Sequence, residues 1–140
     1  MTESRVHTLI SRAKRYDIIF RTDASTSNGW KISIQGKRVE DIVYLYSRLR
    51  DYLDDNNVPF KIATKKRLDI KGEQGNKAMT IYCPNGTRIK DLAQDVYRLI
   101  KDYKGWWDVK TPHGYDHYAG GLFIRNDRDE YGNYIPAKDV

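Results

Sequence analysis

The chain is poor in the features that tie a protein to an unusual chemistry or compartment. It has one cysteine, Cys83, among 140 residues, so it can form neither an intramolecular disulfide nor a metal site with several cysteines. Cys83 stands in an apolar run, where a thiol most often packs as a small hydrophobic side chain. A single thiol fits a reducing compartment, and we expect a cytoplasmic protein.

Long apolar runs are absent too. No stretch approaches the roughly 20 apolar residues that cross a bilayer. The first 16 residues carry four cations and no continuous apolar core, so we expect neither a secretory leader there nor a membrane partner. Internal repeats and low-complexity tracts are also absent. A chain of 140 residues therefore predicts one domain with one core.

Negative charge is the scarcer sign. The sequence has 25 Lys and Arg against 19 Asp and Glu, which gives a formal charge of +6 and a pI near 9.3. Such an excess favours an anionic partner. Phosphate, nucleic acid and an acidic peptide all satisfy that condition, and a generically basic surface is the alternative reading.

What the chain does contain is apolar periodicity typical of an α+β domain. Spacings of three and four predict amphipathic helices at 6–13, 39–53 and 89–103. Extended or alternating patterns predict strands at 16–20, 30–34, 58–63, 78–83 and 121–125. After the N-terminal helix, the central order is that of a ferredoxin-like βαββαβ sheet covered by helices. We expect Trp30, Ile32, Ile34, Phe60, Ile62, Met79, Ile81 and Phe123 in its core.

Cations fall on these strands and between them. Alternation turns Lys31 away from the core face, and Lys61 lies on the next strand. The connector to the third strand carries Lys65, Lys66, Arg67 and Lys77. A phosphomonoester is nearly dianionic and presents three strong acceptors, so convergent cations of this kind suit its recognition. Solvated surface lysines are the alternative interpretation.

Four motifs follow one another along the chain. They are GWKISI at 29–34, VPFK at 58–61, NKAMTIYCP at 76–84 and DHYAGGLF at 116–123. Their order and spacing resemble the N-terminal lyase domain of class III lanthionine synthetases, which is related to the phosphothreonine lyases of bacterial effectors. The resemblance implies a lyase-like domain at 1–125 with its core at 29–125, and a C-terminal tail at 126–140 similar to the linker before that family's kinase domain.

The resemblance implies β-elimination of phosphate from phosphoserine or phosphothreonine in a peptide or protein, without metal or other cofactor. By motif position Lys61 is the expected base, with Lys65 or Lys66 as alternatives, and such a lysine must be neutral near pH 7. Lys31 and Lys77 are the expected phosphate ligands. Tyr82 is expected to orient the phosphate or the substrate backbone.

Two positions depart from the family pattern. Ala119 stands where the family has an arginine after the His-Tyr pair, and Arg125 is the candidate replacement. Lys31 stands where the effector lyases have a histidine general acid, and His117 is the candidate substitute. These departures leave open a catalytically inactive binding module for a phosphorylated, nucleotide or acidic protein ligand.

A nucleic-acid-binding protein is the third hypothesis. It would use the excess of Lys and Arg together with Trp106, Trp107 and Tyr115 as stacking surfaces. The sequence shows no recognition motif for RNA or DNA, and no serine-hydrolase, phosphate-loop or zinc signature. The phosphoamino-acid lyase therefore leads the three hypotheses.

Overall fold

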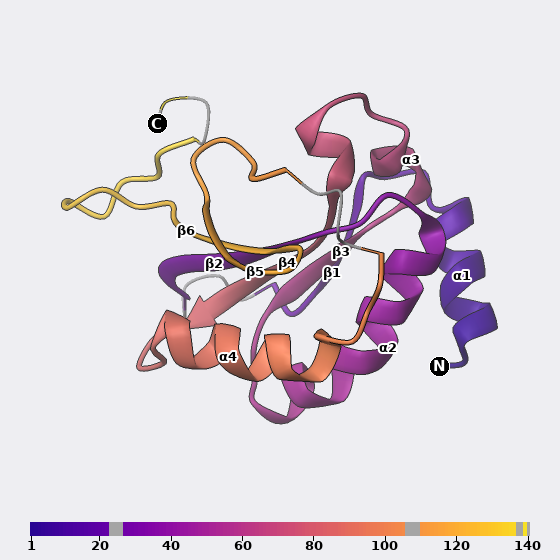
Figure 1. Cartoon of the computed structure of the whole chain (residues 1–140), viewed down its shortest axis with the longest axis horizontal. Helices are drawn as coiled ribbons and strands as arrows, with labels where there is room; N and C mark the ends of the chain where they lie inside the picture. The colour runs from indigo at the N-terminus through magenta and orange to yellow at the C-terminus, as the bar shows by residue number, and fades with distance from the viewer. Residues whose placement is uncertain (23–26, 106–109, 137–138, 140) are drawn as a thin grey trace.

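Helices cover one face of a six-stranded sheet, and loops lie over the other (Figure 1). This computed structural model describes residues 1–22, 27–105, 110–136 and 139. In chain order the elements are α1 (Glu3–Arg12), β1 (Asp17–Phe20), β2 (Ser27–Gln35), α2 (Val39–Asp55), β3 (Phe60–Ala63), α3 (Lys65–Leu68), the 3₁₀ turn η2 (Glu73–Asn76), β4 (Lys77–Pro84), α4 (Ile89–Ile100), β5 (Asp116–Ala119) and β6 (Leu122–Asn126).

The strands follow the order β1-β3-β4-β2-β6-β5, and every neighbouring pair is antiparallel. The inner strands β3, β4, β2 and β6, with α2 and α4, reproduce the predicted βαββαβ arrangement. The predicted single α+β domain with an N-terminal helix is thus confirmed. The predicted extended segment at 16–20 becomes the edge strand β1, whereas the opposite edge strand, β5, was not predicted.

The core lies between the sheet and the amphipathic helices. Helices α2 and α4 lie on the same side of the sheet, and α1 packs beside α2 (Figure 1). No helix in the described ranges is long and apolar enough to cross a membrane. Each helix buries one face against the sheet. The fully buried helix residues are Ile42, Leu45, Leu49, Leu53, Ala93, Val96 and Ile100, and the buried strand residues that they face are Ile32, Ile34, Ile62, Met79 and Ile81.

One predicted core residue lies on the wrong side. Phe123 is buried, but it pairs with Ser33, whose side chain alternates with those of Ile32 and Ile34 and therefore faces away from the helices. Its ring packs 5.2 Å from that of His117, measured between centroids. Trp30 is only half-buried at the margin of the core. The remaining six predicted core residues are buried where expected.

The sheet face opposite the helices is polar but covered. Alternation places Lys31, Ser33 and Gln35 of β2 on this face, and Ser33 and Gln35 are buried there. The chain between 110 and 115 and the residues after β6 lie on this side of the sheet (Figure 1, orange and yellow). These polar side chains are therefore covered by other segments of the chain and do not lie in open solvent.

The segment predicted as a tail contains a hairpin, which we call the C-terminal hairpin (Asp127–Ile135). Its base is closed by the Ile135 amide, which donates to the Asp127 carbonyl at 2.7 Å. At its turn the Asp129 carboxylate accepts from the amides of Tyr131 and Asn133, both at 2.8 Å. The hairpin carries the chain back toward the sheet, so the predicted tail contributes to the site described next.

Candidate anion-binding site

A pocket of about 290 Å³ lies on the polar face of the sheet. We call it the cationic pocket, because five of its twelve lining residues are lysine or arginine and one is acidic. The lining consists of Asp17, Lys31, Lys61, Arg67, Gln74, Lys77, Thr80, Tyr82, Tyr115, Arg125, Tyr134 and Pro136. The five cations come from β2, β3, α3, β4 and β6, so the folded sheet assembles charges that are far apart in the sequence.

Strand pairing explains how the predicted residues meet. Lys31 on β2 lies opposite Tyr82 of β4 on one side and opposite Arg125 of β6 on the other. In the next row on the same face, Lys61 of β3 lies opposite Thr80. Because side chains two positions apart on a strand share a face, these residues line one pocket. The structure thus brings Lys31, Lys61 and Tyr82, three of the residues singled out from the sequence, into the lining of one pocket.

Lys77 reaches the pocket through an irregularity in β4. The pairing of β2 with β4 shifts between Ile34, which lies opposite Met79, and Gln35, which lies opposite Lys77. The extra residue, Ala78, forms a bulge, and bulges re-aim neighbouring side chains. The Lys77 ammonium lies 5.3 Å from the centroid of the Tyr115 ring. This bulge is a local feature that periodicity does not reveal.

Lys77 is electrostatically unusual among the pocket lysines. Burial, and then the charges of Lys31, Arg67, Lys61 and Arg125, lower its pKa to about 8. Within the described part of the chain, no carboxylate lies within ion-pair distance of its ammonium group. With that pKa Lys77 is still mostly protonated at pH 7, but about a tenth of it is neutral and able to accept a proton, far more than for an ordinary lysine.

Two carboxylates hold the other cations. Asp17 accepts from the Arg67 guanidinium at 2.9 and 3.0 Å and lies 3.6 Å from the Lys61 ammonium. Asp127 lies 3.6 Å from the Lys31 ammonium. Burial lowers the pKa of Lys31, and the nearby Asp127 carboxylate opposes that shift. Lys31 and Lys61 therefore each have an acidic partner.

Arg125 is the most deeply buried cation, with 3% of its surface exposed. Its Nη2 donates to the carbonyl of Ile135 at the base of the C-terminal hairpin. Its guanidinium carbon lies 6.0 Å from the centroid of the Tyr115 ring. Its Nε–H, however, has no hydrogen-bond partner among the described residues. A buried donor without an acceptor is costly.

The charge balance favours a multiply charged anion. Five cations line the pocket, and two carboxylates, Asp17 and Asp127, lie beside them, which leaves three positive charges unmatched. Tyr82 and Tyr115 remain neutral, because burial raises the pKa of each phenol to about 12. A phosphomonoester dianion, with oxygens that accept several hydrogen bonds, fits these conditions.

Three predicted ligands lie elsewhere. Lys65 and Lys66 are exposed on α3; Lys65 pairs with Asp69 at 3.4 Å, and Lys66 donates to the Lys14 carbonyl at 3.1 Å. His117 is exposed on β5, with its Nε2 2.8 Å from the Gly120 carbonyl oxygen. The one-turn helix α3 directs Arg67, not its lysine neighbours, to the pocket.

Sequence patterns missed several lining residues. Thr80 has a detectable signal, because it stands two positions before Tyr82 on the same strand. Arg67 was named among the connector cations, but its contact with Asp17 depends on the pairing of β1 with β3 and was not predicted. Tyr115, expected as an exposed stacking surface, is instead buried against Lys77 and Arg125. The tryptophans expected beside it, Trp106 and Trp107, lie outside the described residues.

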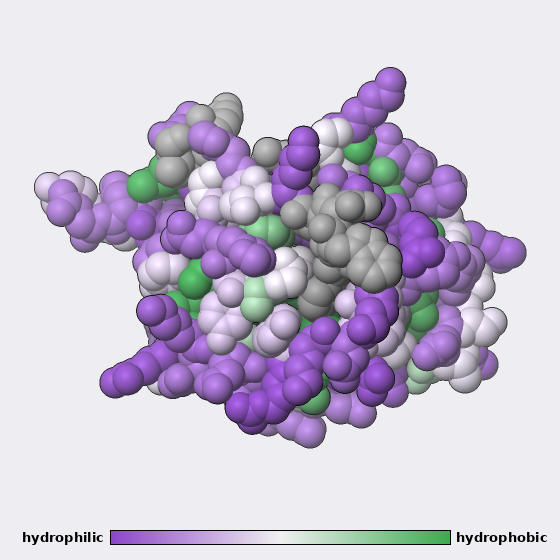
Figure 2. Space-filling view, in the orientation of Figure 1, coloured by the Kyte–Doolittle hydropathy of each residue, from purple (hydrophilic) through white to green (hydrophobic). Residues whose placement is uncertain are grey.

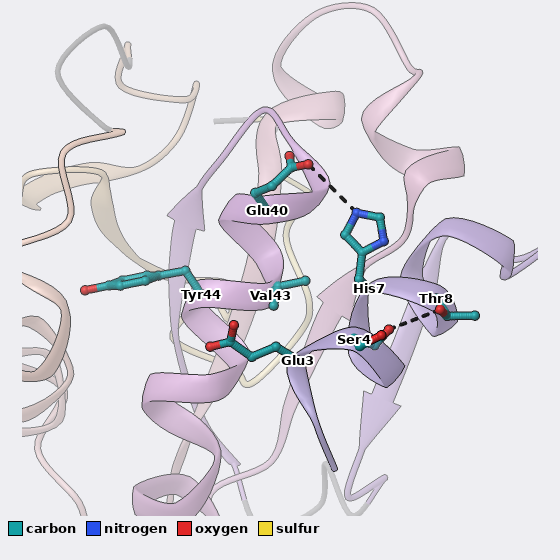
Figure 3. Close-up of a pocket in the computed structure, with 7 residues that line it drawn as sticks. All are labelled: Glu3, Ser4, His7, Thr8, Glu40, Val43 and Tyr44. Carbon is teal, nitrogen blue, oxygen red and sulfur yellow. Dashed lines mark hydrogen bonds and ion pairs between the residues drawn. The ribbon is translucent and has the colours of Figure 1, made fainter.

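A second hollow, of about 430 Å³, lies between α1 and α2. Figure 3 shows His7 of α1 pointing toward Glu40 of α2, and their side chains are 3.8 Å apart. Both side chains are about half-exposed or more. The lining includes no lysine or arginine. The cationic pocket, where charges converge, therefore remains the candidate site.

Other candidate surfaces are modest. The face of the molecule in Figure 2 is largely hydrophilic, with hydrophobic residues in small separate patches. Across residues 1–22, 27–105, 110–136 and 139, no group of three or more His, Cys, Asp or Glu side chains is arranged to hold a metal ion. The cationic pocket therefore carries the chemical argument.

Comparison with known proteins adds no assignment: no family model matches the chain, and no curated protein matches it. The geometry and charge of the cationic pocket, and the sequence motifs that contribute residues to it, are therefore the basis for a function.

Proposed function

We propose that this protein is a phosphoserine or phosphothreonine lyase-like enzyme that binds the phosphorylated side chain of a peptide or protein in the cationic pocket and eliminates phosphate. The observation that carries the proposal is the convergence of five cations from five elements on one pocket of about 290 Å³. The resemblance of the motifs to the lyase domain of class III lanthionine synthetases supports elimination over simple binding.

Arg125 and Lys31 are the proposed phosphate ligands. They are neighbours on paired strands, and Arg125 has an Nε–H that lacks a partner among the described residues. A phosphate oxygen would lie against the Arg125 guanidinium, while the Lys31 ammonium would meet a second oxygen, since both side chains line the pocket. As the bond to phosphate breaks, negative charge grows on these oxygens, so the same two side chains would stabilise the transition state.

The proposed base is Lys77, in place of Lys61. A base must be neutral, and Lys77 has a pKa lowered to about 8, chiefly by burial, whereas Lys61 lies 3.6 Å from the Asp17 carboxylate. The neutral amine would take the proton from Cα. The C–H electrons would form the Cα=Cβ double bond as the Cβ–O bond breaks, and phosphate would leave with the electron pair of the Cβ–O bond.

The test is mass spectrometry of phosphoserine and phosphothreonine peptides incubated with the full chain. Loss of phosphoric acid, leaving a dehydro residue, is the expected product, whereas a phosphatase would leave a hydroxyl group. Lys77→Met is expected to reduce the rate by at least about 100-fold, the usual contribution of a general base, while binding is only weakened. Lys31→Ala should reduce affinity as well as rate, and the exposed Lys90→Met should change neither.

Three outcomes would redirect the proposal. If Lys61→Met abolishes elimination while Lys77→Met preserves it, the base is Lys61. If phosphopeptides bind without elimination, the protein is an inactive binding module, an alternative favoured by the position of His117 outside the pocket lining. If the protein ignores phosphopeptides and binds nucleic acid with steep salt dependence, both phosphoamino-acid hypotheses are wrong.

A further inference from the structure

The cationic pocket combines a nucleophile with a place for phosphate. The Lys77 ammonium and the Arg125 guanidinium lie within about 6 Å of the same Tyr115 ring centroid, at 5.3 and 6.0 Å. Lys77 is half-buried and, among the described residues, lacks a carboxylate partner that would hold it protonated. Arg125 has an unsatisfied Nε–H. Both residues line the cationic pocket, so one small molecule bound there can contact both.

We propose that Lys77 is a covalent modification site for small phosphorylated aldehydes, with Arg125 and Lys31 holding the phosphate while Lys77 condenses with the carbonyl group. The inference rests on the phosphate-binding half of the proposed function and is independent of elimination. It differs from that function in its bond chemistry, because a carbon–nitrogen bond to the protein forms and no carbon–oxygen bond to phosphate breaks.

The condensation balances without a further reagent. The neutral Lys77 nitrogen attacks the carbonyl carbon and gives a carbinolamine. The carbinolamine takes up a proton from solvent as its hydroxyl group leaves as water, and a protonated imine forms. The imine carries the positive charge that the lysine carried before, so the pocket keeps its attraction for phosphate. Its neighbours favour the reaction, because burial and four nearby cations keep part of Lys77 neutral at pH values where exposed lysines are protonated.

The probe is pyridoxal 5′-phosphate, added to the full chain and trapped with borohydride, which reduces the imine to a stable secondary amine. Intact mass and peptide mapping are expected to find one pyridoxyl group per chain, on Lys77. Pyridoxal without phosphate should label Lys77 at least about tenfold more slowly, because it lacks the charge-assisted hydrogen bonds to Arg125. Inorganic phosphate should slow labelling by competing for the same ligands.

Variants make the test specific to Lys77. Lys77→Arg keeps the positive charge, but the guanidinium stays protonated and cannot attack a carbonyl carbon. This variant should therefore lose the label while circular dichroism shows the fold unchanged. The control Lys90→Arg, at an exposed position on α4, should keep it. Arg125→Gln should slow labelling without moving it to another lysine. If Arg125→Gln does not fold, phosphate competition on the wild-type chain tests the same contact.

Two results would overturn the inference: labelling spread over exposed lysines such as Lys37, Lys71 and Lys104, or equal rates with pyridoxal and its phosphate. Its failure is distinguishable from that of the proposed function. Labelling of Lys77 without any dehydro product from phosphopeptides supports the covalent site and contradicts elimination. A dehydro product without labelling of Lys77 supports elimination and overturns the covalent site alone.

Discussion

Arg125 combines a permanent positive charge with almost complete burial. Its Nη2 is held by the Ile135 carbonyl, and its Nε–H has no acceptor in the described ranges. Arg125→Lys keeps the charge but replaces a planar fork of donors with a point charge. We expect the affinity for inorganic phosphate, measured by calorimetry, to fall about 10- to 100-fold, since a hydrogen bond to a charged group contributes roughly 1.5–3 kcal/mol.

Exposed arginines provide the control for that measurement. Arg88→Lys, at the exposed N-cap of α4, should leave phosphate affinity unchanged because it lies outside the pocket lining. Equal losses in Arg88→Lys and Arg125→Lys would mean that overall charge, not the pocket, binds the anion.

Lys77 gives the proposed elimination a pH dependence of known direction. Its pKa is lowered to about 8, first by burial and then by neighbouring cations, and only the neutral amine accepts a proton. Below pH 8, kcat/KM should therefore rise about tenfold per pH unit, and it should level off above pH 8. The midpoint for kcat should lie higher, because bound phosphate favours protonated Lys77. Initial rates from pH 6 to 10 test this, and a profile that falls through pH 8 contradicts Lys77 as base.

At the scale of elements, residues of β4 alternate between the core and the pocket. Ile81 is fully buried toward the helices, whereas its neighbours Thr80 and Tyr82 line the pocket. Ile81→Ala should reduce the free energy of unfolding by about 2 to 4 kcal/mol through lost burial and a cavity. The matched control is Ile19→Ala on β1, where the side chain is 53% exposed and the expected change is under about 0.5 kcal/mol. Urea denaturation of both variants is the measurement, and equal costs would refute the core assignment.

The C-terminal hairpin is an element on which the pocket depends. Its base supplies the Ile135 carbonyl to Arg125 and the Asp127 carboxylate to Lys31, and its turn is held by Asp129. Asp129→Ala should loosen the turn, so the Ile135 amide, bonded to the Asp127 carbonyl, should exchange with deuterium faster. The Ile81 amide in β4 should be unaffected, and unchanged exchange at Ile135 would show that the hairpin does not need this carboxylate.

For the whole molecule, local periodicity predicted the layers of the fold. The inner strands and the helices α1, α2 and α4 alternate or repeat their apolar residues at the spacing of the structure they form. The edge strand β5 was missed because Asp116–Ala119 has no buried face. Phe123 was assigned to the helix-covered core because an apolar residue in a strand does not reveal which face is apolar. Here loop 110–115 and the hairpin bury the second face as well.

The site was predictable where it depends on alternation and not where it depends on distant packing. Lys31, Lys61 and Tyr82 follow from strand alternation once the strands are neighbours. Lys77 lies in the pocket because of a bulge. The Asp17–Arg67 pair and the placement of Tyr115 and Tyr134 arise from contacts between segments far apart in sequence. Those contacts leave no local pattern, so only a structure reveals them.

The cationic pocket also bears on the stability of the whole molecule. A lysine whose folded pKa is about 8, against about 10.4 when unfolded, binds fewer protons folded than unfolded between those values. The free energy of unfolding should therefore rise with pH from about 8 to about 10.4. Below pH 8 Lys77 is protonated in the folded state, and its buried charge lowers the free energy of unfolding by the full amount. A phosphate dianion in the pocket would offset that cost, so it should stabilise the protein most near neutral pH, where Lys77 is protonated and phosphate is still largely dianionic.

Inorganic phosphate should accordingly raise the melting temperature at pH 7. A hundredfold excess over Kd contributes about 2.7 kcal/mol, which for a domain of this size corresponds to roughly 5 to 10 °C. Phosphate also stabilises proteins generally by exclusion from their surface, and that effect would persist in Arg125→Lys, whereas stabilisation through the pocket would largely disappear. Thermal melts of both proteins in phosphate and in NaCl of equal ionic strength separate the two effects. Equal gains in the two proteins would mean that the three unmatched positive charges do not form an anion site.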